Sequence, residues 1–217
     1  MSGHMGSMGP IDRIADEPAR WPVVSSTEDY HGKIIDVRTD VIRSPDGGTA
    51  SREVVIHPGA VGVVALDESG PEPRVLMIRQ YRHPVGRLLW ELPAGLRDVT
   101  GEPLLRTARR ELLEETGYRA ARWDVLVDYF SSPGILTERL RVYLARGLEE
   151  VPEAERDFVP ENEEAHLLLD WVPLDSAASL VLAGEIHNGV AVAGILAAAA
   201  ARQRNFGGLR DAEAPEQ

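Results

Sequence analysis

Three glutamates lie close together on a segment whose apolar spacing predicts a helix. Glu111, Glu114 and Glu115 directly follow Arg110, and Gly117 ends the segment. On a helix Glu111 and Glu115 stand four residues apart on one face, where like charges repel unless a positive charge lies between them. A divalent cation such as Mg²⁺ would supply that charge, since it prefers oxygen ligands. The alternative is a solvated acidic face balanced by arginines of the same helix.

The stretch from residue 95 to 118 resembles the Nudix box, the signature of hydrolases that cleave a nucleoside diphosphate linked to another group. Seven residues separate Glu102 from the run Arg110-Glu111-Leu112-Leu113-Glu114-Glu115-Thr116-Gly117-Tyr118, which follows the family pattern at every position. One departure lies upstream, where six residues separate Gly95 from Glu102 and the family has five. Because the extra residue falls in the loop before the helix, it leaves the helical carboxylates unaffected.

The resemblance implies a metal site. It makes Glu111 and Glu115 metal ligands, Glu114 a ligand or close neighbour, and the Ala94 carbonyl a further oxygen ligand. Arg110, and in the same way Glu102, would orient a carboxylate. The expected cofactor is Mg²⁺, with Mn²⁺ as an alternative.

The general base of this family often lies outside the box. The resemblance to the ADP-ribose hydrolases implies a glutamate base in the loop before a late strand. In this chain that loop contains Glu161, Glu163 and Glu164. We expect Glu164 to be the base and a possible metal ligand because it stands nearest the strand, with Glu163 as second choice. The alternative, a solvent-exposed acidic loop without a catalytic role, holds for at least two of the three glutamates.

Substrate preference rests on a second resemblance, to the ADP-ribose pyrophosphatase branch of the family. Pro133 follows Gly117 by sixteen residues (117 + 16 = 133), and Glu138 lies five residues further on. The alternative for Pro133 is an ordinary turn proline. The runs Arg79-Gln80-Tyr81-Arg82 and Trp90-Glu91-Leu92-Pro93-Ala94-Gly95 are also similar to that branch.

Arginines and a hairpin acid are the remaining candidates for substrate contacts. Arg82, and less strongly Arg79, would bind the diphosphate, because guanidinium groups make forked contacts with phosphate. The alternative is a strand-end arginine paired with a surface acid. Arg52 and Glu53 would reach the adenosine end, and in this branch such groups come partly from the partner subunit of a homodimer.

Composition narrows the partners. A formal charge of −12 argues against a nucleic-acid partner, which would require a basic surface. No apolar run approaches the length of about 18 residues that a membrane span needs. The chain has no cysteine, which suits a reducing cytoplasm. We therefore expect a cytoplasmic protein, and the resemblance implies an enzyme acting on a small nucleotide sugar.

The order of predicted elements indicates an α/β fold. The resemblance implies the Nudix α/β/α sandwich with a mixed sheet, plus a small N-terminal β-hairpin. We divide the chain into an expression-tag remnant (1–10), an N-terminal arm and β-hairpin that forms the dimer (11–57), the Nudix hydrolase domain (58–205) and a disordered tail (206–217). Strands are expected at 33–42, 51–57, 60–66, 75–82, 88–92, 122–129 and 140–148, and before 172. Helices are expected from about 103 to 117, at 176–183 and at 189–203.

These observations together predict metal-dependent hydrolysis of the ADP-ribose diphosphate to AMP and ribose 5-phosphate. One alternative is a hydrolase of another nucleoside diphosphate sugar. A second is a non-catalytic ADP-ribose-binding module, although such modules tend to lose the box glutamates that this chain keeps.

Overall fold

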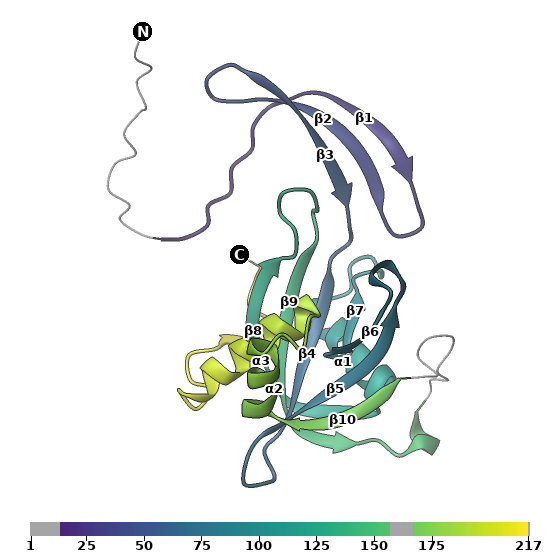
Figure 1. Cartoon of the computed structure of the whole chain (residues 1–217), viewed down its shortest axis with the longest axis vertical. Helices are drawn as coiled ribbons and strands as arrows, with labels where there is room; N and C mark the ends of the chain where they lie inside the picture. The colour runs from purple at the N-terminus through teal and green to yellow at the C-terminus, as the bar shows by residue number, and fades with distance from the viewer. Residues whose placement is uncertain (1–13, 157–166, 217) are drawn as a thin grey trace.

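A computed structural model describes residues 14–156 and 167–216. Within them the strands form two sheets, a three-stranded one in the order β1-β2-β3 and an eight-stranded one (Figure 1). The large sheet runs β10-β5-β4-β9-β8-β11, with β6 paired to β5 and β7 paired to β4. The strands are β1 (Val23–His31), β2 (Asp36–Arg43), β3 (Thr49–Ile56), β4 (Ala60–Asp67), β5 (Arg74–Arg82), β6 (Arg87–Glu91), β7 (Ala94–Leu96), β8 (Tyr118–Phe130), β9 (Arg139–Glu150), β10 (Leu168–Pro173) and β11 (Arg210–Asp211).

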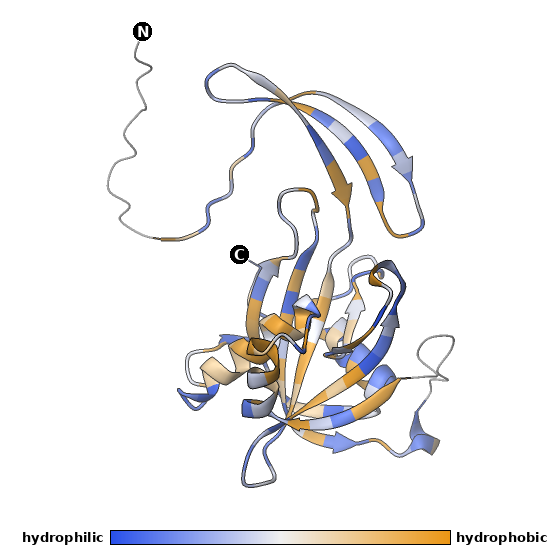
Figure 2. Cartoon of the chain, in the orientation of Figure 1, coloured by the Kyte–Doolittle hydropathy of each residue, from blue (hydrophilic) through white to orange (hydrophobic). Residues whose placement is uncertain are grey.

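The large sheet is mixed because its central strand pairs differently on its two sides. β4 is parallel to β9 and antiparallel to β5 and β7. Its sequence is almost continuously apolar, and its residues from Ala60 to Leu66 are all buried (Figure 2). A strand buried on both faces is expected where helices cover both faces of a sheet.

Helices cover the sheet on opposite faces (Figure 1). They are α1 (Leu104–Thr116), α2 (Leu174–Leu182) and α3 (Gly189–Arg202), with short 3-10 turns at His83–Val85 and Glu153–Glu155. On one face α1 buries Leu105 and Leu112 against Tyr143. On the other, Leu174 of α2 and Ile195 of α3 pack in one apolar cluster with β4 and β9. This is the predicted α/β/α sandwich. In the part of the chain that the structure describes, no helix is long and apolar enough to cross a bilayer.

The N-terminal sheet differs from the predicted hairpin by one strand. β2 and β3 form the expected pair, but β1 adds to β2 within the segment that we predicted as an arm. Every residue of β1 is exposed, so no apolar period revealed it. Its ladder with β2 is supplemented by polar contacts, such as Ser26 Oγ donating to Asp40 Oδ1 at 2.6 Å. The β1–β2 turn closes with Gly32 N–H donating to Ile35 O at 3.0 Å and carries Lys33 at an exposed position.

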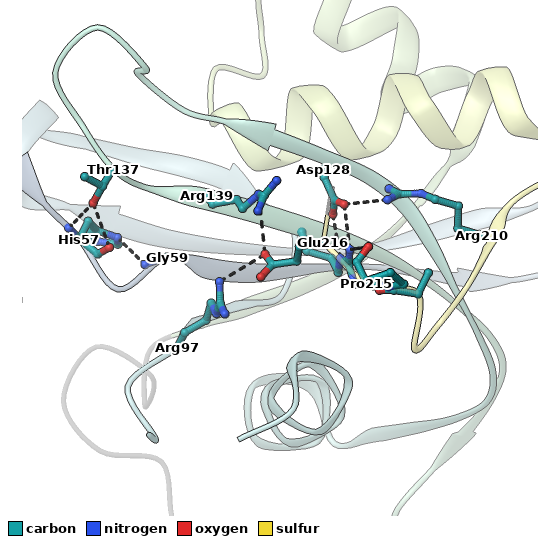
Figure 3. Close-up of polar contacts among 11 residues, drawn as sticks. His57, Gly59, Arg97, Asp128, Thr137, Arg139, Arg210, Pro215 and Glu216 are labelled. Carbon is teal, nitrogen blue, oxygen red and sulfur yellow. Dashed lines mark hydrogen bonds and ion pairs between the residues drawn. The ribbon is translucent and has the colours of Figure 1, made fainter. Parts of the chain in front are cut away.

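The C-terminal segment 206–216 corrects the prediction of a disordered tail. β11 pairs with β8, with Arg210 opposite Val125. The buried Arg141 donates from Nη1 to the Ala214 carbonyl at 2.6 Å and from Nη2 to the Pro215 carbonyl at 3.2 Å. Glu216 then lies 3.3 Å from Arg97 and 3.9 Å from Arg139 (Figure 3). Long-range polar contacts hold this segment, and a local sequence pattern does not show them.

Candidate active site

Helix α1 is fixed at both ends and along its apolar face. Pro103 is its N-cap, and Gly117 ends it with φ of 75° while its N–H donates to the Leu113 carbonyl. Only glycine adopts such a positive φ at little cost. Near the start, Thr107 Oγ1 donates to Glu102 Oε2 at 2.9 Å. With Leu105, Ala108 and Leu112 facing the sheet, the glutamates of the helix are left on its flank and outer side.

The box glycine makes room for Glu111. A Cβ at position 95 would lie 2.0 Å from Cδ of Glu111, which is shorter than any tolerated contact. The Glu111 side chain is therefore packed directly over the backbone of β7. Glu115 reaches the same strand, where its Oε2 accepts a 2.9 Å hydrogen bond from the Ala94 N–H. The structure thus brings Ala94, Glu111 and Glu115 together, as the resemblance implied.

Arg110 lies between the carboxylates of the helix. Its Nη1 is 2.8 Å from Glu111 Oε1 and 3.0 Å from Glu114 Oε2. Its Nη2 lies 3.6 Å from Glu102 and 3.8 Å from Asp98. One guanidinium thus faces four carboxylates, and the orienting roles of Arg110 and Glu102 stay predictions.

The charge state of Glu111 depends on its surroundings. Burial raises the pKa of the Glu111 carboxyl to about 7, with Arg110 opposing that shift and Glu114 adding to it. A carboxyl with such a pKa is not fully ionised at neutral pH. A further positive charge beside it would favour the carboxylate.

The residues fit a hard divalent cation in their chemistry. The implied ligands, Glu111, Glu114, Glu115 and the Ala94 carbonyl, all offer oxygen, which Mg²⁺ and Mn²⁺ prefer. Glu111 and Glu115 both contact β7, and burial raises the pKa of the Glu111 carboxyl. Across residues 14–156 and 167–216, however, no three acidic or histidine side chains already surround one ion position. Arg110 bridges Glu111 and Glu114 instead, so these carboxylates would have to turn toward the ion.

Arg82 makes the alternative contact considered for it, although its partner is a buried acid. Its Nε and Nη2 donate to the two oxygens of Glu91 at 2.9 and 2.8 Å. Glu91 is 2% exposed, and Gln80 donates to it at 3.4 Å. Sequence reasoning missed Glu91 as a partner of Arg82. Its position between the apolar residues Trp90 and Leu92 indicated a buried acid, and a buried charge needs a partner of opposite charge.

Arg79 points to the other face of the sheet. Its guanidinium lies 5.8 Å from the ring centroid of Trp90, beside a cavity of about 350 Å³ that Arg87 and His187 also line. Trp90 packs in the cluster of α2 and α3. The structure therefore does not bring Arg79 to the box glutamates of α1.

The hairpin and loop candidates lie away from α1 as well. Arg52 and Glu53 are exposed on β3, and Arg52 donates to the Ser51 carbonyl at 2.8 Å. Glu138 accepts a hydrogen bond from Ser131 and lies 3.4 Å from His57 Nδ1.

Pro133 borders a cavity of about 740 Å³ together with Phe130 and Arg139. The base candidates Glu161, Glu163 and Glu164 lie outside the described residues.

Comparisons with known proteins agree with this geometry. The NUDIX domain family model matches residues 56–191. The chain is 51% identical over 176 residues to an ADP-ribose pyrophosphatase of Mycobacterium tuberculosis, covering 80% of this chain and 81% of that protein. It is 34% identical over 165 residues to an ADP-ribose pyrophosphatase of Bacillus subtilis, covering 76% and 85%.

A solved structure, described as the crystal structure of ADP compounds hydrolase, shares the fold. The TM-score is 0.70 at 19% identity, and the match covers 89% of this chain and 99% of that one. The family match includes the whole box, with the glutamates that the structure places against β7. The chain belongs to the Nudix hydrolase family.

Proposed function

We propose that this protein is a divalent-metal-dependent diphosphatase that hydrolyses ADP-ribose to AMP and ribose 5-phosphate. The observation that carries the proposal is the seating of Glu111 over Gly95 beside Glu115. Both carboxylates of α1 thereby contact β7, the strand that leads into the box. The similarity to two ADP-ribose pyrophosphatases supports the substrate.

The reaction needs groups that hold the diphosphate and activate water. A bound Mg²⁺, or Mn²⁺, would neutralise phosphoryl charge when held by Glu111, Glu115, Glu114 and the Ala94 carbonyl. Water attacks one phosphorus, the bond from that phosphorus to the bridging oxygen breaks, and the water proton passes to the base. We propose Glu164 as this base and as a metal ligand, with Glu163 as the second candidate.

Substrate contacts come from the remaining candidates. Arg82, oriented by Glu91, would bind the diphosphate, and Arg79 remains the weaker candidate because it lies on the other sheet face. Pro133 and Glu138 belong to a loop that meets β3 through the bridge between Val55 and Leu136. Arg52 and Glu53 would act across a homodimer. We also propose a cytoplasmic location, which suits a chain without cysteine.

The first test is the substitution Glu115→Gln, which keeps the shape of the side chain and removes its charge. We expect loss of turnover with an unchanged circular dichroism spectrum, because the metal loses a carboxylate. Glu155→Gln, at an exposed site on the 3-10 turn, is the matched control and keeps full activity. Substantial turnover by Glu115→Gln with Mg²⁺ would overturn the metal assignment.

The second test identifies substrate and base. Phosphate released by added phosphatase is measured across ADP-ribose, other nucleotide sugars and dinucleotides, with chelator as the metal-free control. Preference for another nucleotide sugar, or tight binding without turnover, would favour one of the two alternatives.

Glu164→Gln or Glu163→Gln should lower the rate by about a hundredfold, a typical contribution of a general base. If neither does, the base lies elsewhere.

A further inference from the structure

A basic groove lies on the flank of α1 that does not face β7. It has a volume of about 550 Å³ and is lined by residues of α1 and β8 together with Glu102. Arg109 and Glu111 are two positions apart, so their side chains point about 200° apart around the helix axis. The groove, called here the α1–β8 groove, therefore lies on another side of the helix than Glu111, and it shares Arg110 and Glu102 with the carboxylate network.

The groove carries excess positive charge. Its lining includes the four arginines 106, 109, 110 and 119, and one acid, Glu102. Arg110 faces four carboxylates and Arg106 faces Glu102, so the excess positive charge comes from Arg109 and Arg119. The chain as a whole has a formal charge of −12. Such a local reversal of charge attracts anions.

Two of these arginines have no carboxylate partner among the residues described. Arg109 lies with its guanidinium carbon 5.9 Å from the Trp123 ring centroid, and it forms no ion pair there. Arg119 stands opposite Glu149 in the β8–β9 ladder, but the described part of the chain gives it no ion pair. Arg106 is 78% exposed and 3.5 Å from Glu102, which Arg110 shares.

Part of the lining of the groove is apolar. Trp123, Leu113 and Ala120 line it together with the arginines. Its volume is within the range of about 300 to 1,000 Å³ of small-molecule sites, which combine apolar walls with a few polar groups. Guanidinium groups match phosphate oxygens in charge and in shape.

We propose that the α1–β8 groove is a second ligand site, which binds a small phosphate-bearing molecule through Arg106, Arg109 and Arg119. The proposal does not require the proposed activity to be correct. A ligand there would also border Arg110, which contacts Glu111 on the far side of the helix.

The test is titration calorimetry of the full chain with inorganic diphosphate, in buffer freed of divalent metal and low in salt. The groove variant is Arg109→Gln/Arg119→Gln, with each single substitution measured as well. Arg122→Ala is the matched control, since Arg122 lies on the same strand and pairs with Glu68 at 3.1 Å outside the groove. Circular dichroism checks that every variant is folded.

We expect the wild type and Arg122→Ala to bind diphosphate with the same affinity. The affinity of the groove variant should be at least about tenfold lower. The box variant Glu111→Gln/Glu115→Gln should keep wild-type affinity. Unchanged affinity in the groove variant, loss of binding in the box variant, or no binding by the wild type would overturn the proposal.

The same titration with AMP identifies the source of the phosphate groups. Tighter binding of AMP points to an organic phosphate whose ring packs on the apolar part of the lining. Tighter binding of diphosphate points to an inorganic polyphosphate.

Discussion

Gly95 leaves space that the Glu111 carboxyl occupies. We predict that Gly95→Ala lowers turnover by at least about a hundredfold, because a displacement of about 1 Å at a reacting centre has such an effect. The physical reason is the 2.0 Å approach between the added Cβ and Cδ of Glu111. Steady-state kinetics at saturating Mg²⁺ measures the change.

Gly70→Ala is the control for that substitution. A Cβ at Gly70 would meet its nearest neighbour, the Glu72 carbonyl oxygen, at 3.8 Å, an ordinary contact. We expect full activity from this variant. If Gly95→Ala is folded and as active as Gly70→Ala, the Glu111 carboxyl is not required at that position.

Asp128 provides a prediction on pH. Burial alone would raise the pKa of its carboxyl, but hydrogen bonds from Arg141 and Arg210 outweigh burial and hold that pKa below the usual 3.8. Because the pKa is lower in the folded state, the carboxylate stabilises the fold above its unfolded pKa, and this stabilisation is lost as the pH falls through the folded pKa.

We expect Asp128→Asn to lower the free energy of unfolding by about 3 kcal/mol at pH 7, since it leaves the buried Arg141 without its anion. The difference from wild type should narrow below about pH 4. Urea unfolding at several pH values measures both. Asp175→Asn, whose carboxylate is 70% exposed beside Arg202, should change stability by less than about 1 kcal/mol. A pH-independent difference for Asp128→Asn would contradict this assignment.

At the residue scale, the order of residues in the box was informative. Glu111 and Glu115 both lie against β7, at Gly95 and Ala94, and the role of these groups as metal ligands stays a prediction. The partner of Arg82 was missed, because Glu91 reaches it through the pairing of β5 and β6. Arg79 faces away from α1 because side chains alternate along a strand, which needs the sheet faces to be known.

Among the helices and strands, those with a regular pattern of apolar residues in the sequence were predicted, and those without such a pattern were missed. α1, α3 and β4 follow their expected ranges closely. β1 is polar and exposed, so only its pairing with β2 reveals it. β11 has two residues, and the segment after it is held by Arg141.

Removing residues 212–217 should destabilise the protein by about 2 kcal/mol or more, because Arg141 loses two carbonyl acceptors in a buried place. Chemical denaturation measures the loss. Glu216→Gln, which removes only partly exposed ion pairs, should cost less than about 1 kcal/mol. Equal effects of the two changes would show that the carbonyl contacts contribute nothing.

The whole molecule consists of a layered domain and an exposed sheet attached through β3 (Figure 1). That sheet and the arm before it carry exposed apolar side chains, with Val24 at 51%, Tyr30 at 57% and Trp21 at 47%. Exposed apolar side chains on and beside an edge strand favour contact with another chain. We infer that a second copy covers it.

We therefore expect a mass in solution of twice the 23.8 kDa of the chain. Val24→Asp combined with Tyr30→Asp should produce a monomer, because a charge cannot be buried in that contact without a partner. Light scattering after size exclusion measures the mass. Leu182→Asp, at a residue 79% exposed on α2, should leave the mass unchanged. A monomeric mass for the wild type would contradict the homodimer, and Arg52 and Glu53 could then not act across subunits.

The β1–β2 turn also has a practical consequence for labelling. Lys33 is the only lysine of the chain, whose other basic side chains, histidines apart, are arginines. An amine-reactive dye reacts at neutral pH mainly with the terminal α-amino group, whose pKa is lower, so blocking that group first and then raising the pH directs the dye to this turn. The unmodified sequence thus accepts a fluorophore on the N-terminal sheet, where energy transfer between two labelled copies would report their approach.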